Sequence, residues 1–324
     1  MQAAITQSDV AREAGVSRGL VSLALADSPR VATETKERIR EVAARLGYSR
    51  NFGAAALASS RSMLIGVVLP NLRNPYFESL VAAFQAESEA RGYTVLTATA
   101  SGDEARERAM LEHFQTMRVG GLILATPSRP ASHYVSIASR LPLVIAGSPY
   151  DGGPAHVVHI DEFEAARIAV THAVDRGYCR VVYLAEDVDS EAAGYRRAAI
   201  VAAAEAAGLE VDVMTPVASA EKFGTQAKRE PGSVCIFAHN DYLAIDVVSQ
   251  LRQAGIVPGS DVGIISYDNT FLARHAGFDL TSIDQQPDVQ AKLALDAIEA
   301  LAADSDPSGG DIVVSPQLVV RTSS

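Results

Sequence analysis

Apolar residues near the N-terminus recur every three or four positions, which is the spacing of short amphipathic helices. Within residues 6–27, Thr6 is followed three positions later by Asp9, a pair that predicts an N-cap. Gly15 supplies a left-handed residue that ends the first helix, and Ser17 is expected to cap a second. Two short helices joined by a glycine turn are typical of a helix-turn-helix, the alternative being two helices of an ordinary helical core.

The second predicted helix has an apolar face and an outward face. Its inward side chains are expected to be Val16, Leu20, Val21, Ala24 and Leu25. Its early, outward face is expected to carry Ser17, Arg18, Gly19, Ser22 and Leu23. A third helix is predicted over residues 33–46, with Gly47 at its end, so the three helices make a compact DNA-binding headpiece. In such a headpiece the outward face of the second helix enters the major groove.

From Met63 onward, apolar runs of strand length alternate with helical patterns. The predicted strands are 64–69, 94–100, 121–126, 143–147, 157–160, 181–185, 211–215, 234–238 and 262–267. The predicted helices are 75–91, 103–117, 132–139, 162–176, 195–207, 219–228, 241–254 and 288–301. Continuous apolar strands flanked by helices imply parallel sheets covered on both faces, so we expect two α/β units in tandem, the second beginning after His156. A cleft between two such lobes is the expected ligand site, because ligands bind at the carboxyl ends of the strands.

Composition places the chain among globular proteins. Its 324 residues are 48% apolar, enough for two or three domains with their own cores. No run reaches 18 consecutive apolar residues, and the first residues resemble no secretory signal, so we expect a cytoplasmic protein without a membrane span. Cys179 and Cys235 lie in separate apolar segments without C-x-x-C spacing, which predicts reduced core residues rather than a disulfide or metal site.

The net charge of −11 is unevenly distributed along the chain. Residues 1–62 carry nine basic and six acidic side chains, a net charge of +3, and the remainder carries −14. The N-terminal segment can therefore approach phosphate while the rest of the chain is repelled. Because few cations contribute, we expect weak non-specific DNA binding with marked salt sensitivity.

Several segments together resemble one known family. The N-terminal part reads DVAREAGVS, then VS at 21–22, then RVATETKERIREVAARLGY, and later come IGVVLPNLRNPYF, HND, ISYDN, LTSIDQ and LVVRTSS. In this order they are similar to the lac-repressor and purine-repressor family of bacterial transcription regulators. The resemblance implies an α/β fold class with a three-helix headpiece (1–48), a hinge (49–62) and a two-lobed periplasmic-binding-protein-like body of parallel sheets flanked by helices (63–324). It also implies an effector in the cleft.

The segment between headpiece and body consists mainly of small residues. Asn51 is a candidate N-cap, and Leu57 is its one large aliphatic side chain. The resemblance implies a hinge helix that pairs with its twin in the minor groove and inserts Leu57 between base steps. The segment departs from the family at Arg50, where a proline is usual, and at Gly53, which costs about 1 kcal/mol of helix propensity.

Polar residues follow several of the predicted strands of the body. Asn240 comes after the strand at 234–238, where it is either a helix cap or a cleft residue, and Asp268 and Gln285 also stand at strand ends. The resemblance implies that these three line the effector pocket. In the segment 74–77, Asn74 precedes a proline suited to the first helical position, and Phe77 either stacks on a ligand or belongs to the core.

Two departures from the family concern the expected pocket. The family usually carries an arginine three residues before the glycine of a Gly-aromatic pair, and here that glycine is Gly194, so the position is Glu191. Gly147 stands where some sugar-binding members have an aspartate. A pocket with Glu191 and Asp268 and without that arginine favours a donor-rich or cationic ligand, unless Glu191 faces solvent or ligand binding has been lost.

No sequence motif for catalysis is present, and we expect neither an enzyme nor a cofactor. His156 and His159 are spaced so that a strand places their rings on opposite faces, which argues against a shared metal ion. We therefore expect a homodimeric repressor that binds double-stranded operator DNA under the control of a small-molecule effector. One alternative is a solute-binding protein of a transporter, which predicts a secretory signal and no headpiece. The other is a cleft enzyme, which would need a nucleophile or metal cluster.

Overall fold

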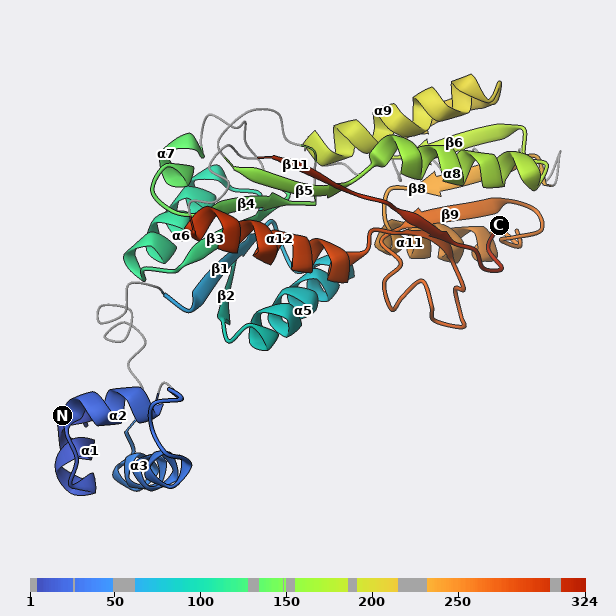
Figure 1. Cartoon of the computed structure of the whole chain (residues 1–324). Coiled ribbons are helices and arrows are strands. Elements are labelled where there is room, and N and C mark those ends of the chain that lie inside the picture. The colour runs from blue at the N-terminus through green and yellow to red at the C-terminus, as the bar shows by residue number, and fades with distance from the viewer. Residues whose placement is uncertain are drawn as a thin grey trace. The chain divides into compact units, whose positions relative to one another are not determined.

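The structure is a computed structural model, shown in Figure 1, in which the chain forms two units, Met1–Ser62 and Met63–Ser324. The residues it describes are 5–25, 27–48, 62–127, 134–147, 149, 155–185, 191–214, 232–303 and 310–324, with the backbone alone at Glu191. The predicted hinge and the predicted helix at 219–228 lie outside these residues. Among the described residues, no helix combines the length and the apolar character that a membrane span requires.

The first unit consists of α1 (Gln7–Ala14), α2 (Arg18–Leu25) and α3 (Thr33–Leu46). Thr6 caps α1 in a capping box, because its hydroxyl accepts from the Asp9 amide at 3.4 Å and the Asp9 carboxylate accepts from the Thr6 amide at 3.0 Å. Gly15 ends α1 in the left-handed conformation with φ 64°. The Ser17 hydroxyl accepts from the Leu20 amide at 3.2 Å, as expected for the cap of α2.

One apolar cluster holds the three helices of this unit together. Its buried members are Val10, Ala11, Val21, Ala24, Val31, Ile39, Val42 and Ala43. Val16, Leu20 and Leu25 pack partly buried against it, so the predicted inward face of α2 is confirmed. The ion pairs Lys36–Asp27 (3.0 Å) and Arg45–Glu13 (2.9 Å) lie at the surface, where such pairs contribute little stability. Burial of the apolar face therefore holds the headpiece together.

The second unit contains two six-stranded sheets. The first has the order β11-β5-β4-β3-β1-β2, and its strands are β1 (Leu64–Leu69), β2 (Thr94–Thr99), β3 (Gly121–Ala125), β4 (Leu143–Ala146), β5 (His156–Ile160) and β11 (Asp311–Val314). The second has the order β12-β10-β9-β8-β6-β7, and its strands are β6 (Arg180–Leu184), β7 (Glu210–Met214), β8 (Val234–Ala238), β9 (Gly263–Tyr267), β10 (Thr281–Asp284) and β12 (Gln317–Val319). All neighbours pair in parallel except β12, which is antiparallel to β10.

Helices cover both sheets and define two lobes. The first lobe contains α5 (Pro75–Ala90), α6 (Glu104–Thr116), α7 (Val135–Ala138) and α12 (Pro287–Ala302). The second lobe contains α8 (Glu162–Asp175), α9 (Glu191–Ala206) and α11 (Asp241–Gln253). In β1, Val67 packs in the cluster that includes α5 and α12, whereas Val68 packs in the one that includes α6. Burial on both faces explains why this strand is a continuous apolar run.

The prediction of two lobes of parallel strands flanked by helices is confirmed, but their tandem order along the chain was wrong, because each lobe is assembled from separate parts of the chain. The strand β5, expected to open the second lobe, lies in the first sheet, and α12 also packs on the first lobe. The strands β11 and β12 were not predicted, and Figure 1 shows the chain passing along them from the first sheet to the second. The chain therefore crosses between the lobes three times, after β5, β10 and β11.

The prediction of a core position holds for one cysteine and fails for the other. Cys235 is buried in β8, whereas Cys179 is exposed in the turn before β6. Its Sγ lies 3.5 Å from the carbonyl oxygen of Ser233, outside the apolar run that begins after Arg180. The apolar residues that follow Cys179 therefore predicted β6 correctly, but they did not show that Cys179 lies before its first residue.

We expect Gly259→Ala to destabilise the protein strongly, because the carboxyl-terminal segment packs against this turn. Gly259 has φ +86°, and a Cβ there would lie 2.0 Å from the backbone oxygen of Thr322. Gly255→Ala is the matched control, since Gly255 has φ +72° with nothing within 4 Å of its Cβ position. Thermal unfolding should show a loss of about 1 kcal/mol for the control and about 3 kcal/mol or more for Gly259→Ala. Equal losses would contradict the packing described.

Candidate functional site

A cavity of about 440 Å³ lies between the two lobes. Its walls are the segments that follow β1, β2, β3 and β4 in the first lobe, and those that follow β8, β9 and β10 in the second, together with the start of α9. These are carboxyl ends of parallel strands, where α/β folds bind ligands. The volume is within the range of small-molecule sites.

Five of the six residues predicted for the effector pocket line this cavity. They are Asn74, Phe77, Asn240, Asp268 and Gln285. The sixth, Glu191, is the first residue of α9, and its side chain lies outside the described part of the structure. The five residues come from segments far apart in the sequence, and the crossing of the chain between the lobes brings them together.

Asp268 connects the two lobes through hydrogen bonds. Asn74 Nδ2 donates to Asp268 Oδ2 at 3.0 Å from the first lobe, and Gln285 Nε2 donates to Asp268 Oδ1 at 2.5 Å from the crossing after β10. Asn74 also caps α5, because its Oδ1 accepts from the Tyr76 amide at 3.0 Å. Both Oδ1 and Nδ2 of Asn74 therefore form hydrogen bonds, and the bond that Oδ1 accepts orients Nδ2 toward Asp268.

The backbone and the burial of Asp268 are both unusual. Its φ is 100°, a region that residues other than glycine rarely adopt, and its side chain is buried. Burial raises the pKa of Asp268 to about 7, although Arg196 acts in the opposite direction, and Asp241 raises it further. Strained backbone and a perturbed carboxyl group in a cavity are features of functional sites.

A second buried carboxylate, Asp241, supports the turn that carries Asp268. It accepts from the hydroxyls of Ser266 at 2.5 Å and Ser282 at 2.8 Å, and from the amide and hydroxyl of Thr270 at 2.7 and 2.8 Å. These bonds join β9, β10 and the turn after β9. Burial raises the pKa of Asp241 despite its four donors.

Asn240 caps the following helix and also lines the cavity. Its Oδ1 accepts from the Leu243 amide at 2.8 Å at the start of α11, which confirms the capping interpretation. The residue is buried and lines the cavity. Phe77 likewise has two environments, because it is part of the core of the first lobe and part of the cavity wall.

The cavity contains an arginine at a position that the sequence analysis did not single out. Arg196 is buried in the cavity wall, on the same face of α9 as Ala192, one helical turn earlier. Its Nη2 lies 3.1 Å from Glu162 Oε1, and its Nη1 donates to the carbonyl oxygen of His239 at 2.8 Å. Its guanidinium carbon lies 3.6 Å from the centroid of the Tyr267 ring. The sequence could have identified Arg196, because it lies four positions after Ala192 and therefore on the same face of α9.

The groups beneath Arg196 form a connected buried network. Tyr267 donates its phenol proton to Glu162 Oε2 at 2.5 Å, and the Tyr183 hydroxyl lies 2.8 Å from His239 Nδ1. Burial, reinforced by the charge of Arg196, holds the pKa of His239 well below its usual range, so its ring is neutral at physiological pH. The network keeps the arginine in place at the bottom of the cavity.

The histidines of β5 do not act as a pair in the structure. His159 Nε2 lies 2.7 Å from Asp311 Oδ1 on β11, and its Nδ1 lies 2.6 Å from the Ile160 carbonyl oxygen. His156 is buried near Gly310. In the described ranges, no cluster of three or more histidine, cysteine or acidic side chains is placed to bind a metal ion.

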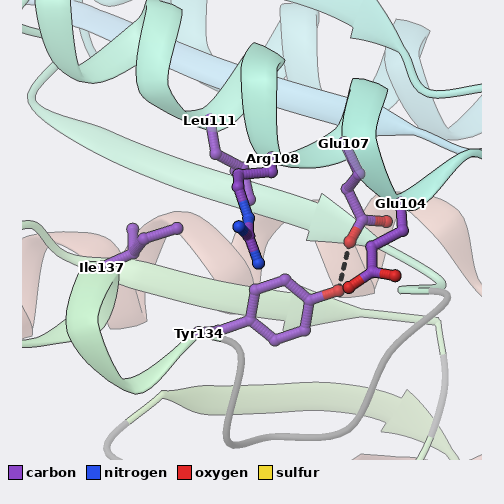
Figure 2. A pocket seen from close by; sticks show the side chains of 6 residues that line it. All are labelled: Glu104, Glu107, Arg108, Leu111, Tyr134 and Ile137. Atoms are coloured by element: carbon purple, nitrogen blue, oxygen red, sulfur yellow. Dashed lines mark hydrogen bonds between the residues drawn. The ribbon is translucent and has the colours of Figure 1, made fainter.

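A second cavity, beside α6, has a volume of only about 20 Å³. Figure 2 shows Tyr134 pointing toward Glu107, to which its hydroxyl donates a hydrogen bond, with Glu104 and Arg108 nearby. This space is sufficient for about one water molecule. The cleft between the lobes is therefore the better candidate for an organic ligand.

The residues predicted to contact DNA have two different environments in the headpiece. Thr6 and Ser17 cap α1 and α2. Arg18, Gly19, Ser22 and Leu23 are exposed on α2, and Leu23 has an exposed fraction of 40% although it is apolar. Asn51 and Leu57 lie outside the described residues. Contact of these residues with DNA stays a prediction.

We expect Asp268→Asn to stabilise the protein more at pH 8 than at pH 5. Because the folded-state pKa is raised to about 7, ionisation of Asp268 opposes folding increasingly as the pH rises from about 4 to 7. The variant removes this effect, and asparagine tolerates positive φ. The gain in unfolding free energy should be about 2 kcal/mol larger at pH 8. Asp246→Asn, on the exposed side of α11, controls for the loss of a surface carboxylate. A gain independent of pH would contradict the assignment.

Comparison with known proteins places both units in known families. Residues 6–51 match the family described as "Bacterial regulatory proteins, lacI family", and residues 170–324 match the periplasmic binding protein-like domain. The HTH-type transcriptional regulator PtxS of Pseudomonas plecoglossicida is 28% identical, covering 98% of this chain and 95% of that protein. The ribose operon repressor of Escherichia coli K12 is 27% identical, covering 90% and 92%.

Solved structures share the fold at lower identity. The lac repressor dimer bound to operator and the anti-inducer ONPF has a TM-score of 0.82 at 23% identity, with 99% of each chain covered. A CelR–cellobiose complex has a TM-score of 0.69 at 22% identity, covering 99% of this chain and 100% of that one. The headpiece match, the body match and relatives that span nearly the whole chain agree. The chain therefore carries a DNA-binding domain of the lacI family of bacterial regulatory proteins, followed by a periplasmic binding protein-like domain.

Proposed function

We propose that this protein is a repressor that binds a pseudo-palindromic operator as a homodimer and responds to a small polar effector in the cleft. The observation that carries the proposal is the exposed face of α2, where Arg18, Ser22 and Leu23 project from a headpiece whose apolar residues are buried. A recognition helix of this kind reads base edges in the major groove. The relatives named above are transcriptional regulators, which supports regulation rather than catalysis.

The body would act as the sensor. In our proposal residues 1–48 bind DNA, residues 49–62 form the hinge, and residues 63–324 bind the effector and the second protomer. Asn74, Phe77, Asn240, Asp268 and Gln285 contact the effector, and Arg196 joins them. Because these residues come from both lobes, a ligand that contacts all of them favours one arrangement of the lobes. Affinity for the operator then depends on the ligand.

A selection from a random pool of duplex DNA tests the proposal directly. The full chain should enrich sequences with two symmetry-related half-sites, since a homodimer presents two headpieces. Binding should weaken as the salt concentration rises, because the basic residues of the headpiece displace counterions from the phosphates they contact. If no sequence is enriched above non-specific binding, the proposal is wrong.

Arg18 is expected to read one base. At the start of α2, an exposed arginine can donate two hydrogen bonds to a guanine edge, whereas Leu23 offers only apolar contact, for example to a thymine methyl. Arg18→Ala should weaken operator binding by about 1 to 3 kcal/mol and relax the preference at one position. Arg38→Ala, an exposed arginine on α3, should leave the base preference unchanged. Equal weakening on all sequences would make Arg18 a phosphate contact.

Leu57 is expected to act as a wedge in the minor groove. Leu57→Ala should leave the body folded and dimeric but lower operator affinity and DNA bending, because the contact that offsets base unstacking is lost. Energy transfer between dyes at the two ends of an operator duplex measures the bend. A normal bend angle with normal affinity would refute this role.

A further inference from the structure

The buried groups around the cleft carry an excess of negative charge. Glu162, Asp241 and Asp268 are buried carboxylates, whereas Arg196 is the one buried cation among the described residues of this region. Arg73 also lines the cavity, but its side chain is exposed to solvent. Charge buried in a protein requires compensation by an opposite charge or by several donors.

The charge of Arg196 is already compensated within the protein. Its Nη2 lies 3.1 Å from Glu162 Oε1, its Nε lies 3.4 Å from both oxygens of Glu162, and its Nη1 donates to the carbonyl oxygen of His239. One face of the guanidinium lies over the Tyr267 ring. An anionic ligand would therefore compete with Glu162 for this arginine.

Asp268 is compensated less directly, because Arg196 acts on it electrostatically without forming an ion pair with it. Its hydrogen-bond donors, Asn74 and Gln285, are neutral amides. No lysine, arginine or histidine in the described part of the chain forms an ion pair with it. Asp241, which lies behind it, is bonded by hydroxyl groups and one backbone amide. The guanidinium of Arg321, which acts on Asp241 electrostatically, donates to Asn269 Oδ1 at 2.6 Å and to the Leu280 carbonyl oxygen at 2.5 Å.

We propose that the effector of this protein carries a protonated amine that binds beside Asp268, with an apolar part of the ligand against Phe77. This inference rests on the proposed function, because it names the class of the cleft ligand. An ammonium group donates three hydrogen bonds and supplies the positive charge that the cluster lacks. A neutral sugar would supply hydroxyl donors but no positive charge.

The charge arrangement predicts how binding responds to pH. The ammonium group requires ionised Asp268, whose pKa in the free protein is raised to about 7 by burial, with Arg196 opposing and Asp241 adding to the shift. Affinity should therefore fall about tenfold between pH 8 and pH 6, and binding near pH 7 should release about half a proton per ligand. A ligand that is neutral should show no such release.

Calorimetry on the full chain with matched pairs of probes tests the inference. Three hexosamines with their parent hexoses, putrescine with 1,4-butanediol, and tyramine with tyrosol differ chiefly in the amine. At pH 8, at least one amine should bind tenfold or more tightly than its neutral partner and should lose about tenfold at pH 6. Asp268→Asn should abolish this preference, and Asp246→Asn should retain it.

Three outcomes would overturn the inference. They are neutral partners that bind as tightly as their amines in every pair, an affinity for the preferred amine that is unchanged in Asp268→Asn, and no binding by any amine. Thermal unfolding of Asp268→Asn at pH 8 verifies that the variant is folded. The selection of duplex DNA on the same protein separates this inference from the proposed function. Enriched operators without an amine preference would refute the ligand class alone, whereas the absence of enrichment would refute the function.

Discussion

The hydrogen bond from Asn74 to Asp268 joins the two lobes across the cleft, and the rest of the site depends on it. Asn74 is held by its role as the cap of α5, and Asp268 is held in a strained conformation by the network of Asp241. Each lobe thus presents a fixed group to the other, without a mobile side chain between them. A ligand that enters the cleft must bind to this contact or replace it.

The path of the chain explains how such a contact can influence the whole body. Each lobe is a sheet packed on both faces and therefore stiff, and the chain crosses between the two lobes three times. Gln285, which donates to Asp268, is itself in one of these crossings. A change at Asp268 therefore acts on a segment where the relative orientation of the lobes is set.

The sequence predicted the local features well and the long-range ones less well. Caps, helices and buried strands follow from nearby residues, so the headpiece helices and the strand ends that carry Asn240 and Asp268 could be anticipated. The sheet that β5 joins could not be, because an apolar strand does not reveal its neighbours. Arg196 was missed because only Glu191, three residues before Gly194, was considered as the position of an arginine. The face of α9 that lines the cavity carries Ala192 and, one turn later, Arg196.

In the proposed function, the cleft and the DNA-binding headpiece are energetically coupled. Thermodynamic linkage makes this coupling reciprocal. If a ligand changes the affinity for operator by some factor, bound operator changes the affinity for that ligand by the same factor. The most direct test is calorimetric titration of a cleft ligand into the full chain, free and saturated with operator duplex. We expect the dissociation constants of the ligand for the free protein and for the operator-bound protein to differ. Their ratio should equal the factor by which the ligand changes operator affinity. Identical ligand affinities for the free and the DNA-bound protein would contradict it.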